Sequence, residues 1–275
     1  MTDAEQSWSR PFDQVLALES VADDRFETRL SGFGAVTLGC ATLAAALSTD
    51  HALHSLHTYF LRAVPTDRPV TLSVERLRDG RRFSHRRVQV RAEDQLLCEL
   101  LASFAAPGDG FRAQDVTLDP ATPHPESLPS EAEIAQMEGW DTDQPLDPLE
   151  WRWVDKPPWR LDGPSSGSGY GAWVRPRLPL PDGRAWQAAA IAYLADYHSH
   201  MSVVRWLGAF AEPHFYTSLD QSIWLHRDVA WDDWWHLTTE GVVAHAGRAL
   251  TRRSLHTRDG RLVATTAQEQ LIPAP

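Results

Sequence analysis

The sequence predicts an α+β protein built from two copies of one domain, each copy an antiparallel sheet wrapped around a single buried helix. Two observations lead to this prediction. An R-x3-RR pattern occurs once in each half of the chain, and each time an acidic turn and an apolar run follow it. Each half carries one short, almost wholly apolar helical stretch, and several strand-like segments follow that stretch. The arginines of the pattern are Arg82, Arg86 and Arg87 in the first copy and Arg248, Arg252 and Arg253 in the second.

The spacing of the repeat indicates a duplicated domain. Repeats that build solenoids are roughly 20–50 residues long, whereas this pattern recurs only once in a chain of 275 residues. Parallel strands would need helical crossovers between them, so the uninterrupted strand segments favour antiparallel pairing. A chain of this length also suffices for two domains that each bury a core.

The first half begins with a strand and the apolar helix. Residues 21–30 predict the strand. Residues 35–47 are apolar on nearly every face of a helix, which predicts burial on all sides rather than a surface position. In the strands that follow, Val70, Leu72 and Val74 alternate with polar residues, as in a half-buried strand. Four strands are expected, near 54–62, 69–77, 82–91 and 95–105.

The central segment interrupts this order. Residues 107–168 are rich in proline, aspartate and glycine and end in a glycine- and serine-rich run, which predicts an inter-domain linker with some packed segments. The predicted domains are therefore 1–108 and 169–275, with 109–168 as the linker. This linker carries a cluster of tryptophans, Trp140, Trp151, Trp153 and Trp159.

The second half repeats the order of the first. A strand at 170–178 precedes a helix at about 183–199, which contains the apolar run 188–195. One helix followed only by strand-like segments again predicts a sheet wrapped around that helix. These strands are expected near 216–226, 234–243, 247–257 and 261–272.

Composition limits the partners and the compartment. The net charge of −11 argues against a nucleic-acid partner, because neutralising phosphates requires a basic surface. The two cysteines, Cys40 and Cys98, lie in separate segments, so we expect no disulfide scaffold and a cytoplasmic location. The N-terminus shows no signal-peptide pattern, and the longest apolar runs are too short to span a bilayer.

Several stretches resemble one enzyme family. The stretch HSLHTYFLRAVPTDRPVTLSVERLRDGRRFSHRRVQV (54–90) resembles the first half of TesB-type acyl-CoA thioesterases, the acyl-CoA thioesterase II family. TSLDQSIWLHR (217–227) and TRDGRLVATTAQEQLI (257–272) resemble its second half. The resemblance implies a double hotdog, that is, two fused hotdog folds. It also implies hydrolysis of fatty acyl-CoA to free fatty acid and CoA, with no cofactor and no covalent intermediate.

The resemblance also implies a catalytic site. In this family an Asp late in the second helix, a Thr or Ser at the start of the next strand and a Gln near the C-terminus hold and activate a water. The matching residues are Asp196, Ser218 and Gln268. Two departures bear on substrate preference and leave these three residues untouched. The first helix starts GFGAVTLG where the family usually reads FGGQ, and Asp228 follows the HR pair where the family has a proline.

The chemistry of Asp196 and Ser218 supports these assignments. Near the C-terminal end of a buried helix, lost hydration and the helix dipole both raise the pKa of a carboxyl, which suits a general base near neutral pH. The alternative for Asp196 is a helix end open to water. Ser218 is expected to orient water rather than act as a nucleophile, because it does not lie in a G-x-S-x-G nucleophile elbow between a strand and a helix. Nearby Asp220 is an alternative acid.

Gln268 lies in the strand-like run LVATTAQEQLI. An inward-facing glutamine there would need a partner and could position a water without titrating. The alternative is an outward-facing, solvated glutamine. The repeat favours the first interpretation, because the equivalent first-half position is Ser103, while Ser218 pairs with Ser55. The two halves therefore differ where chemistry would occur.

Two other clusters receive structural interpretations. The arginines between 76 and 91 are expected to form a solvated strand face paired with Glu75 and Asp79, rather than a site for CoA phosphates. The three histidines between 51 and 57 recur at three-residue spacing across a loop-to-strand junction, so they would not share a face and no metal site is predicted.

These observations predict an acyl-CoA thioesterase with Asp196 as base and with acyl-CoA as partner. At least a homodimer is expected, because exposed sheet edges are usually paired. The acyl tail should lie in an apolar tunnel between helix and sheet. A non-catalytic acyl-CoA or lipid-binding hotdog protein is the second possibility, favoured by the altered helix start. A hydratase is the third, although Asp196 with His198 matches its Asp/His pair only weakly.

Overall fold

The computed structural model describes residues 10–138, 148–157, 164, 167, 169–207 and 216–272. In this part of the chain all strand pairs are antiparallel and belong to one sheet. The first strands along the sheet come from the N-terminal half of the chain and the others from the C-terminal half. The strand order is β1-β2-β4-β5-β6-β3-β10-β13-β12-β11-β8-β7, with β9 beside β13.

The N-terminal half follows the predicted order with one correction. A hairpin of two short strands replaces the single strand predicted over 21–30, because the chain reverses at Asp24, which has a positive φ of 56° that Asp tolerates better than most residues. The helices are α2 (Phe12–Val15) and α3 (Gly34–Ala46), and the strands are β1 (Glu19–Ala22), β2 (Arg25–Thr28), β3 (Ala52–Phe60), β4 (Val70–Asp79), β5 (Phe83–Ala92) and β6 (Gln95–Ala105).

The C-terminal half contains a second long helix, α5 (Arg184–Asp196), and a shorter one, α6 (Met201–Leu207). One continuous helix was predicted over 183–199, but α5 ends at Asp196 because Tyr197 is extended and His198 has a positive φ of 56°. The strands are β8 (Tyr170–Pro176), β9 (Thr217–Ser218), β10 (Asp220–Leu225), β11 (Trp235–His245), β12 (Arg248–Thr257) and β13 (Leu262–Leu271).

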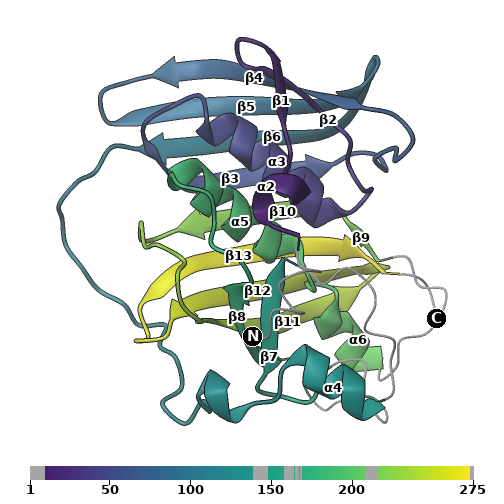
Figure 1. The fold of residues 1–275 in the computed structure, drawn as a ribbon, viewed down its shortest axis with the longest axis vertical. Coiled ribbons are helices and arrows are strands. Elements are labelled where there is room, and N and C mark those ends of the chain that lie inside the picture. The colour runs from purple at the N-terminus through teal and green to yellow at the C-terminus, as the bar shows by residue number, and fades with distance from the viewer. Residues whose placement is uncertain are drawn as a thin grey trace.

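The segment between the halves adds three short elements, a 3-10 turn η1 (Pro125–Ser127), α4 (Glu131–Glu138) and β7 (Leu149–Trp153). Strand β7 extends the sheet beyond β8, and its Trp151 and Trp153 are buried. Trp140 and Trp159 of the predicted tryptophan cluster lie outside the described residues. Residues 106–124, which precede η1, form a loop that first stands away from the body of the molecule (Figure 1) and then contacts it, where Gln114 binds Gly260 and Leu262.

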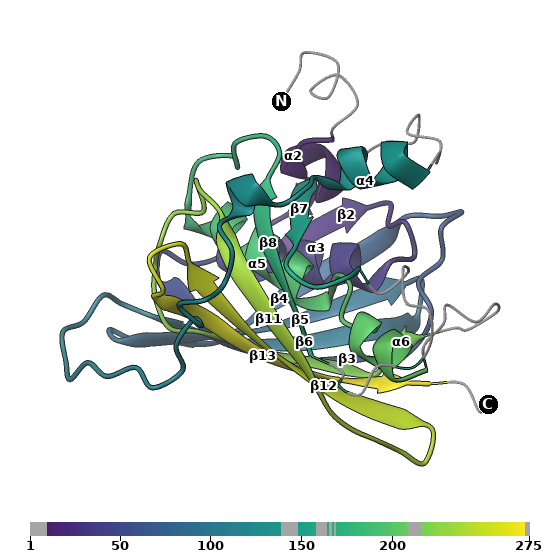
Figure 2. The ribbon, with the colours of Figure 1, turned by 90° about the horizontal axis from the view of Figure 1, so that it is seen from below.

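Helices α3 and α5 lie side by side within the curve of the sheet (Figure 2). They run antiparallel, because Gly34 at the start of α3 lies beside Asp196 at the end of α5, and Gly39 lies beside Ala189 near the middle. A Cβ on Gly39 would come within 2.7 Å of Leu16, so its lack of a side chain permits this close packing. The sheet wrapped around one helix is thus confirmed in each half; α3 is buried on all sides as predicted, and α5 is buried from Ala188 to Asp196.

The halves join where β3 pairs with β10. Leu56 of β3 lies opposite Ile223 of β10, and both side chains are fully buried. Full burial of such a side chain stabilises a fold by about 1.5–3 kcal/mol, so this pair holds the two halves in one core as well as in one sheet.

Each half buries one arginine against the end of its helix. Arg86 is 1% exposed and donates to the backbone oxygen of Ser48 at 3.1 Å; Arg253 is also 1% exposed and donates to that of Tyr197 at 2.6 Å. The R-x3-RR pattern aligned Arg86 with Arg252 instead, whose side chain is 60% exposed. A slip of one residue moves a strand side chain to the opposite face, so the repeat is real but its literal alignment is wrong at this position.

The other arginines near this strand pair with acidic neighbours. Arg76 binds Asp24 at 2.6 Å, and Arg87 pairs with Glu75 at 3.5 Å. Even the buried Arg86 reaches Asp79 at 2.6 Å. The predicted paired strand face is therefore confirmed for Arg87, whereas Arg86 belongs to the interior.

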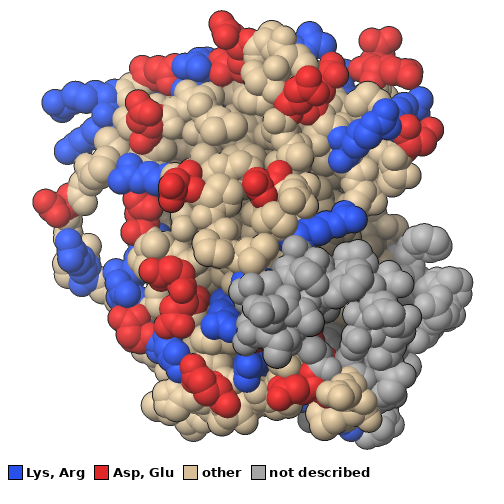
Figure 3. All heavy atoms as spheres, viewed as in Figure 1, with Lys and Arg blue, Asp and Glu red and all other residues tan. Residues whose placement is uncertain are grey.

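Acidic and basic side chains are interspersed around a mostly uncharged central area on the face shown in Figure 3. This face therefore carries no broad field of one sign. Among the described helices, none combines the length and apolarity needed to cross a bilayer.

Candidate active site

The structure brings Asp196, Ser218 and Gln268 together. The Ser218 hydroxyl donates to Asp196 Oδ1 at 2.8 Å, and the Gln268 Nε2 amide donates to the same oxygen. Gln268 Nε2 also donates to Ser218 Oγ at 2.9 Å. The three residues come from a helix end and from two strands of the sheet, and they form a closed triangle of hydrogen bonds.

Local backbone structure fixes each corner of this triangle. Asp196 is the last residue of α5, where the helix stops against an extended Tyr197. Ser218 lies in the two-residue strand β9, which pairs with Gln270 of β13. Gln268 lies on β13 with its side chain buried, as the inward interpretation of the sequence required.

Asp220, the alternative acid of the sequence analysis, has a structural role. Its Oδ1 accepts the backbone N–H of Glu269 at 2.9 Å, so it ties the start of β10 to β13. Since β10 follows β9 directly, this bond also holds the backbone next to Ser218. Asp220 is a structural carboxylate beside the site, and Asp196 is the one that the side chains of Ser218 and Gln268 bind.

Burial dominates the electrostatics of Asp196. Its side chain is 5% exposed, which rules out the helix end open to water. Lost hydration raises the pKa of this carboxyl, although the hydrogen bonds from Ser218 and Gln268 and the positive charge of Arg253 act against the rise. A raised pKa brings the carboxylate closer to the range in which a general base works at neutral pH.

Gly34 is the site residue that the sequence analysis missed. A Cβ at this position would lie 2.7 Å from Asp196 Oδ2, so only glycine leaves room for the carboxylate. The residue lies in the GFG start of the first helix, but its proximity to a residue of the other half has no local sequence signal. Since Ser218 and Gln268 both bind Oδ1, Asp196 turns its Oδ2 toward the first turn of α3.

That first turn of α3 begins with backbone N–H groups that have no acceptor within the helix. The first intrahelical bond runs from Thr37 N–H to Phe33 O at 3.2 Å, so the N–H groups of Gly34, Ala35 and Val36 precede it. The N-cap residue Phe33 supplies no side-chain cap. An uncapped helix N-terminus attracts negative charge, so these donors are suited to a charge that develops beside Asp196.

Aromatic rings surround the end of α5. Tyr197 stacks on Tyr193 and on Trp151, with ring centroids 5.4 and 5.8 Å apart, and Phe33 meets it edge-on at 5.3 Å. Trp153 stacks on Trp151 in turn. These rings make an apolar environment next to Asp196.

The neighbouring histidines are neutral near neutral pH. Burial is the main cause that lowers the pKa of His200 to about 4, and the positive charge of Arg253 lowers it further. Burial also lowers the pKa of His198 well below its usual value. The His198 ring packs against Trp151 and Trp153, with centroids 5.1 and 5.7 Å away, so it lies among aromatic side chains.

Ser55 and Ser103, which the repeat equates with Ser218 and Gln268, lie away from this triangle of hydrogen bonds. Ser55 and Ser103 face each other across β3 and β6 on the outer side of the sheet, where they line a shallow pocket. The inward neighbours of Ser103 are Ala102 and Phe104, both buried. The equivalence with Ser103 was therefore wrong by one residue, and the inner surface of β6 is apolar where β13 carries Gln268.

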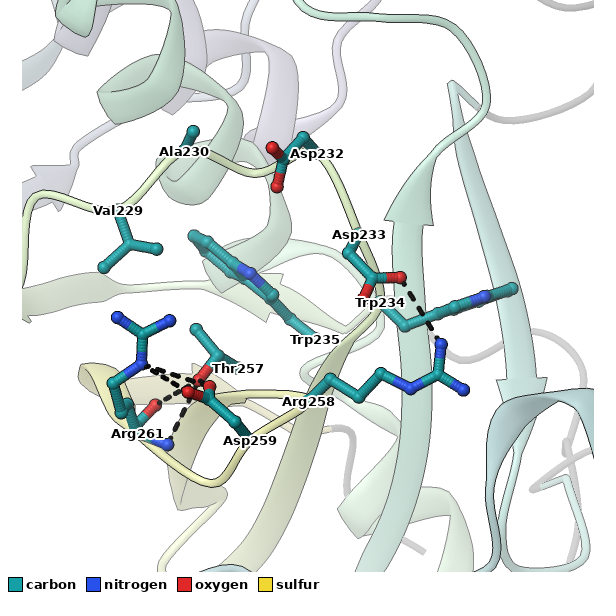
Figure 4. A pocket seen from close by; sticks show the side chains of 10 residues that line it. All are labelled: Val229, Ala230, Asp232, Asp233, Trp234, Trp235, Thr257, Arg258, Asp259 and Arg261. Carbon is teal, nitrogen blue, oxygen red and sulfur yellow. Dashed lines mark hydrogen bonds and ion pairs between the residues drawn. The ribbon is translucent and has the colours of Figure 1, made fainter.

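A surface pocket of about 370 Å³ lies elsewhere (Figure 4). Trp231 N–H donates to Gln187 Oε1 at 3.0 Å, which places the adjacent loop beside the early turns of α5, far along the helix from Asp196. Arginines pair with two of the pocket's aspartates, since Asp259 lies 2.8 Å from Arg261 and Asp233 lies 3.7 Å from Arg258. The third aspartate, Asp232, is exposed like the other two, so this pocket lacks a buried carboxylate such as Asp196 and is not the candidate site.

Comparison with protein families matches both halves. Residues 23–105 match the acyl-CoA thioesterase N-terminal domain, and residues 122–272 match the acyl-CoA thioesterase C-terminal domain. Acyl-CoA thioesterase 2 of Haemophilus influenzae is 30% identical over 278 residues, which cover 94% of this chain and 95% of that protein. Acyl-coenzyme A thioesterase 8 of Homo sapiens is 30% identical over 287 residues, covering 94% and 87%.

Solved structures show the same arrangement. The crystal structure of an acyl-CoA thioesterase II from Mycobacterium marinum has a TM-score of 0.79 and 30% identity, and the match covers 96% of this chain and 98% of that one. A protein with a hot dog fold from Alicyclobacillus acidocaldarius has a TM-score of 0.77 at 17% identity over the full length of both chains, which indicates the fold alone. The predicted double hotdog is confirmed.

Proposed function

Because this chain belongs to the acyl-CoA thioesterase family and is a thioester hydrolase, we propose that it hydrolyses fatty acyl-CoA to free fatty acid and CoA, using a water activated by Asp196, Ser218 and Gln268. One observation carries this assignment. A buried carboxylate with a raised pKa is held by a hydroxyl and an amide, beside an uncapped helix N-terminus.

Asp196 acts as the general base. Its Oδ2 takes a proton from the water while the water oxygen bonds to the thioester carbonyl carbon. The carbonyl oxygen becomes an oxyanion, which the N–H groups at the start of α3 stabilise. The carbon–sulfur bond then breaks, the proton passes from Asp196 to the sulfur, and the products are the fatty acid and CoA.

Ser218 and Gln268 place the base and the water. Both bind Oδ1, which fixes the carboxylate plane and leaves Oδ2 for the water. The Ser218 hydroxyl retains acceptor capacity after its bond from Gln268, so it can also bind the water. Neither side chain titrates near neutral pH, so both keep this role while Asp196 changes its charge.

Thiol release from short- to long-chain acyl-CoAs tests the proposal, with wild type beside Asp196→Asn. Asparagine keeps the shape and the Oδ1 acceptor but removes the base, so turnover should fall roughly 10²–10⁴-fold with folding intact. The matched control is Asp50→Asn, which changes an exposed carboxylate at the other end of the helix pair and should leave turnover unchanged.

Two results would contradict the proposal in different ways. Full turnover by Asp196→Asn would remove Asp196 from the chemistry while leaving the hydrolase. No turnover by wild type on any chain length would instead favour an acyl-CoA-binding protein without catalysis, the alternative that the altered helix start suggests.

A further inference from the structure

Gln270 extends the hydrogen-bonded triangle by one residue. It lies two residues after Gln268 on the inward row of β13 and is 2% exposed. Its Nε2 donates to Gln268 Oε1 at 3.0 Å and to Ser199 Oγ at 2.9 Å. The chain of bonds closes on itself, because the Ser199 backbone N–H donates to Asp196 O at 3.2 Å.

This contact decides which way the Gln268 amide points. An amide has a donor end and an acceptor end, and rotating it by half a turn exchanges them. With Gln270 donating to Gln268 Oε1, the Gln268 Nε2 must face Asp196 and Ser218. The flipped amide would place its oxygen against the carboxylate, where two acceptors repel each other.

We propose that Gln270 is a positioning residue for the hydrolysis, holding the Gln268 amide in the orientation that donates to Asp196. The inference rests on the proposed function, since it acts through Gln268. The Gln270 amide donates to Gln268 and to Ser199, so it acts on Asp196 through Gln268.

The energetics of Gln270 argue for such a role rather than for stability. Among the described residues its own Oε1 is buried without a hydrogen-bond partner. A buried acceptor left unsatisfied is destabilising, and an apolar residue of similar size would avoid that cost. The amide of Gln270 is explained by the hydrogen bond from its Nε2 to Gln268 Oε1. The bond to Ser199 holds that Nε2 in place.

A double-mutant cycle tests the proposal with four enzymes, wild type, Gln270→Met, Gln268→Met and the double variant. Methionine fills a similar volume without a donor. We expect Gln268→Met to lower kcat about a hundredfold and Gln270→Met about tenfold, with KM for acyl-CoA changed less than kcat. In the double variant kcat should equal that of Gln268→Met, because Gln270 has no other route to the carboxylate.

The pH profile separates positioning from a loss of packing. The Gln268 amide lowers the pKa of Asp196, so losing its donor end should move the acid limb of kcat to higher pH in both single variants. A packing defect alone would not move that limb. The matched control is Thr266→Val, two residues before Gln268 on the same buried row, which should leave kcat and the limb unchanged.

Ser199→Ala provides a second variant in case Gln270→Met folds poorly. It removes only the hydroxyl that holds Gln270, so kcat should fall less than in Gln270→Met, and not at all when Gln268 is already methionine. Wild-type kcat and pH profile in both Gln270→Met and Ser199→Ala would overturn the proposal, as would additive losses in the double variant. Full activity of Gln268→Met would instead overturn the proposed function.

Discussion

The two ends of the helix pair are alike in construction and different in chemistry. Helices α3 and α5 have 13 residues each and run antiparallel, so the end of each lies beside the start of the other. At one end Asp196 faces Gly34. At the other end Ala46 lies near Gly183 and Arg184 beside a cavity of about 340 Å³. Duplication thus produced two equivalent places, and only one holds a buried carboxylate.

The second end shows what the scaffold looks like without the chemistry. His51 shares a hydrogen bond with Ser84 at 3.1 Å, and Arg184 pairs with Asp228 at 2.8 Å with both side chains about half exposed. Such exposed pairs contribute little to stability. Ala46 takes the helix position of Asp196 and carries only a methyl group. The comparison teaches that the fold requires the helix packing at both ends but a buried carboxylate at neither.

The largest expected effect concerns what both ends share, the buried arginines. Arg86→Met and Arg253→Met should each lower the free energy of unfolding by roughly 3–5 kcal/mol, because each leaves buried acceptors unsatisfied. Only Arg253→Met should also move the acid limb of turnover to higher pH, because the charge of Arg253 lowers the pKa of Asp196. Urea unfolding and pH–rate profiles measure the two effects.

Two results would contradict the prediction for the two buried arginines. A shift of the acid limb in Arg86→Met would show that the halves are electrostatically coupled. An unshifted limb in Arg253→Met would show that the arginine serves only the end of α5, whose backbone oxygens at Leu194 and Ala195 it binds at 3.0 and 3.2 Å.

The next effect in size contrasts two glycines. Gly34→Ala places a methyl group against Asp196 Oδ2, so the carboxylate must move away from Ser218 and Gln268, and kcat should fall roughly 10²-fold with little loss of stability. Gly183→Ala meets nothing within 4 Å but has a φ of 111°. It should lower stability by about 1–3 kcal/mol through backbone strain and leave kcat unchanged.

Thermal unfolding and steady-state kinetics on both glycine variants check this contrast. Wild-type kcat in Gly34→Ala would mean that the carboxylate has another productive position. A loss of kcat in Gly183→Ala at a temperature where it is folded would mean that strain at the start of α5 reaches its far end.

Sequence patterns predicted the elements well because those patterns are local. The apolar run of α3 and the alternation of Val70, Leu72 and Val74 report burial directly, and the structure buries both. The register of the repeat was harder to predict, because bulges or irregular pairings interrupt several strand pairs, for example between Arg76 and Arg78. Each irregularity can exchange the two faces of a strand.

The candidate site likewise combines residues that the sequence predicts with residues that only the fold reveals. Asp196, Ser218 and Gln268 were predicted from the resemblance to the family, and only the fold shows that they converge. Gly34 and Gln270 carry no local signal, because the role of each depends on an atom of another element. Gly34 matters only because α5 ends beside it, and Gln270 only because the side chain of Gln268 points its oxygen toward it.

The smallest expected effect is a pH-dependent difference in the free energy of unfolding, caused by the carboxylate at one of the two helix ends. Burial raises the folded-state pKa of Asp196, so the folded protein binds this proton more tightly than the unfolded chain does. The ionised carboxylate is therefore destabilising above the folded-state pKa, and this destabilisation is relieved as the pH falls through that pKa toward the unfolded value.

Asp196→Asn should therefore be more stable than wild type at pH 8, and the difference should shrink as the pH is lowered. Asparagine still accepts from Ser218 and Gln268, so the change isolates the charge. Ala46→Asn is the control, because it places the same side chain at the other helix end without removing a carboxyl, and its effect on unfolding should not vary with pH. Urea unfolding of each variant at several pH values measures the difference. A constant difference for Asp196→Asn would mean that burial at this end carries no electrostatic penalty, and the reason for confining the carboxylate to one end would have to lie in substrate binding instead.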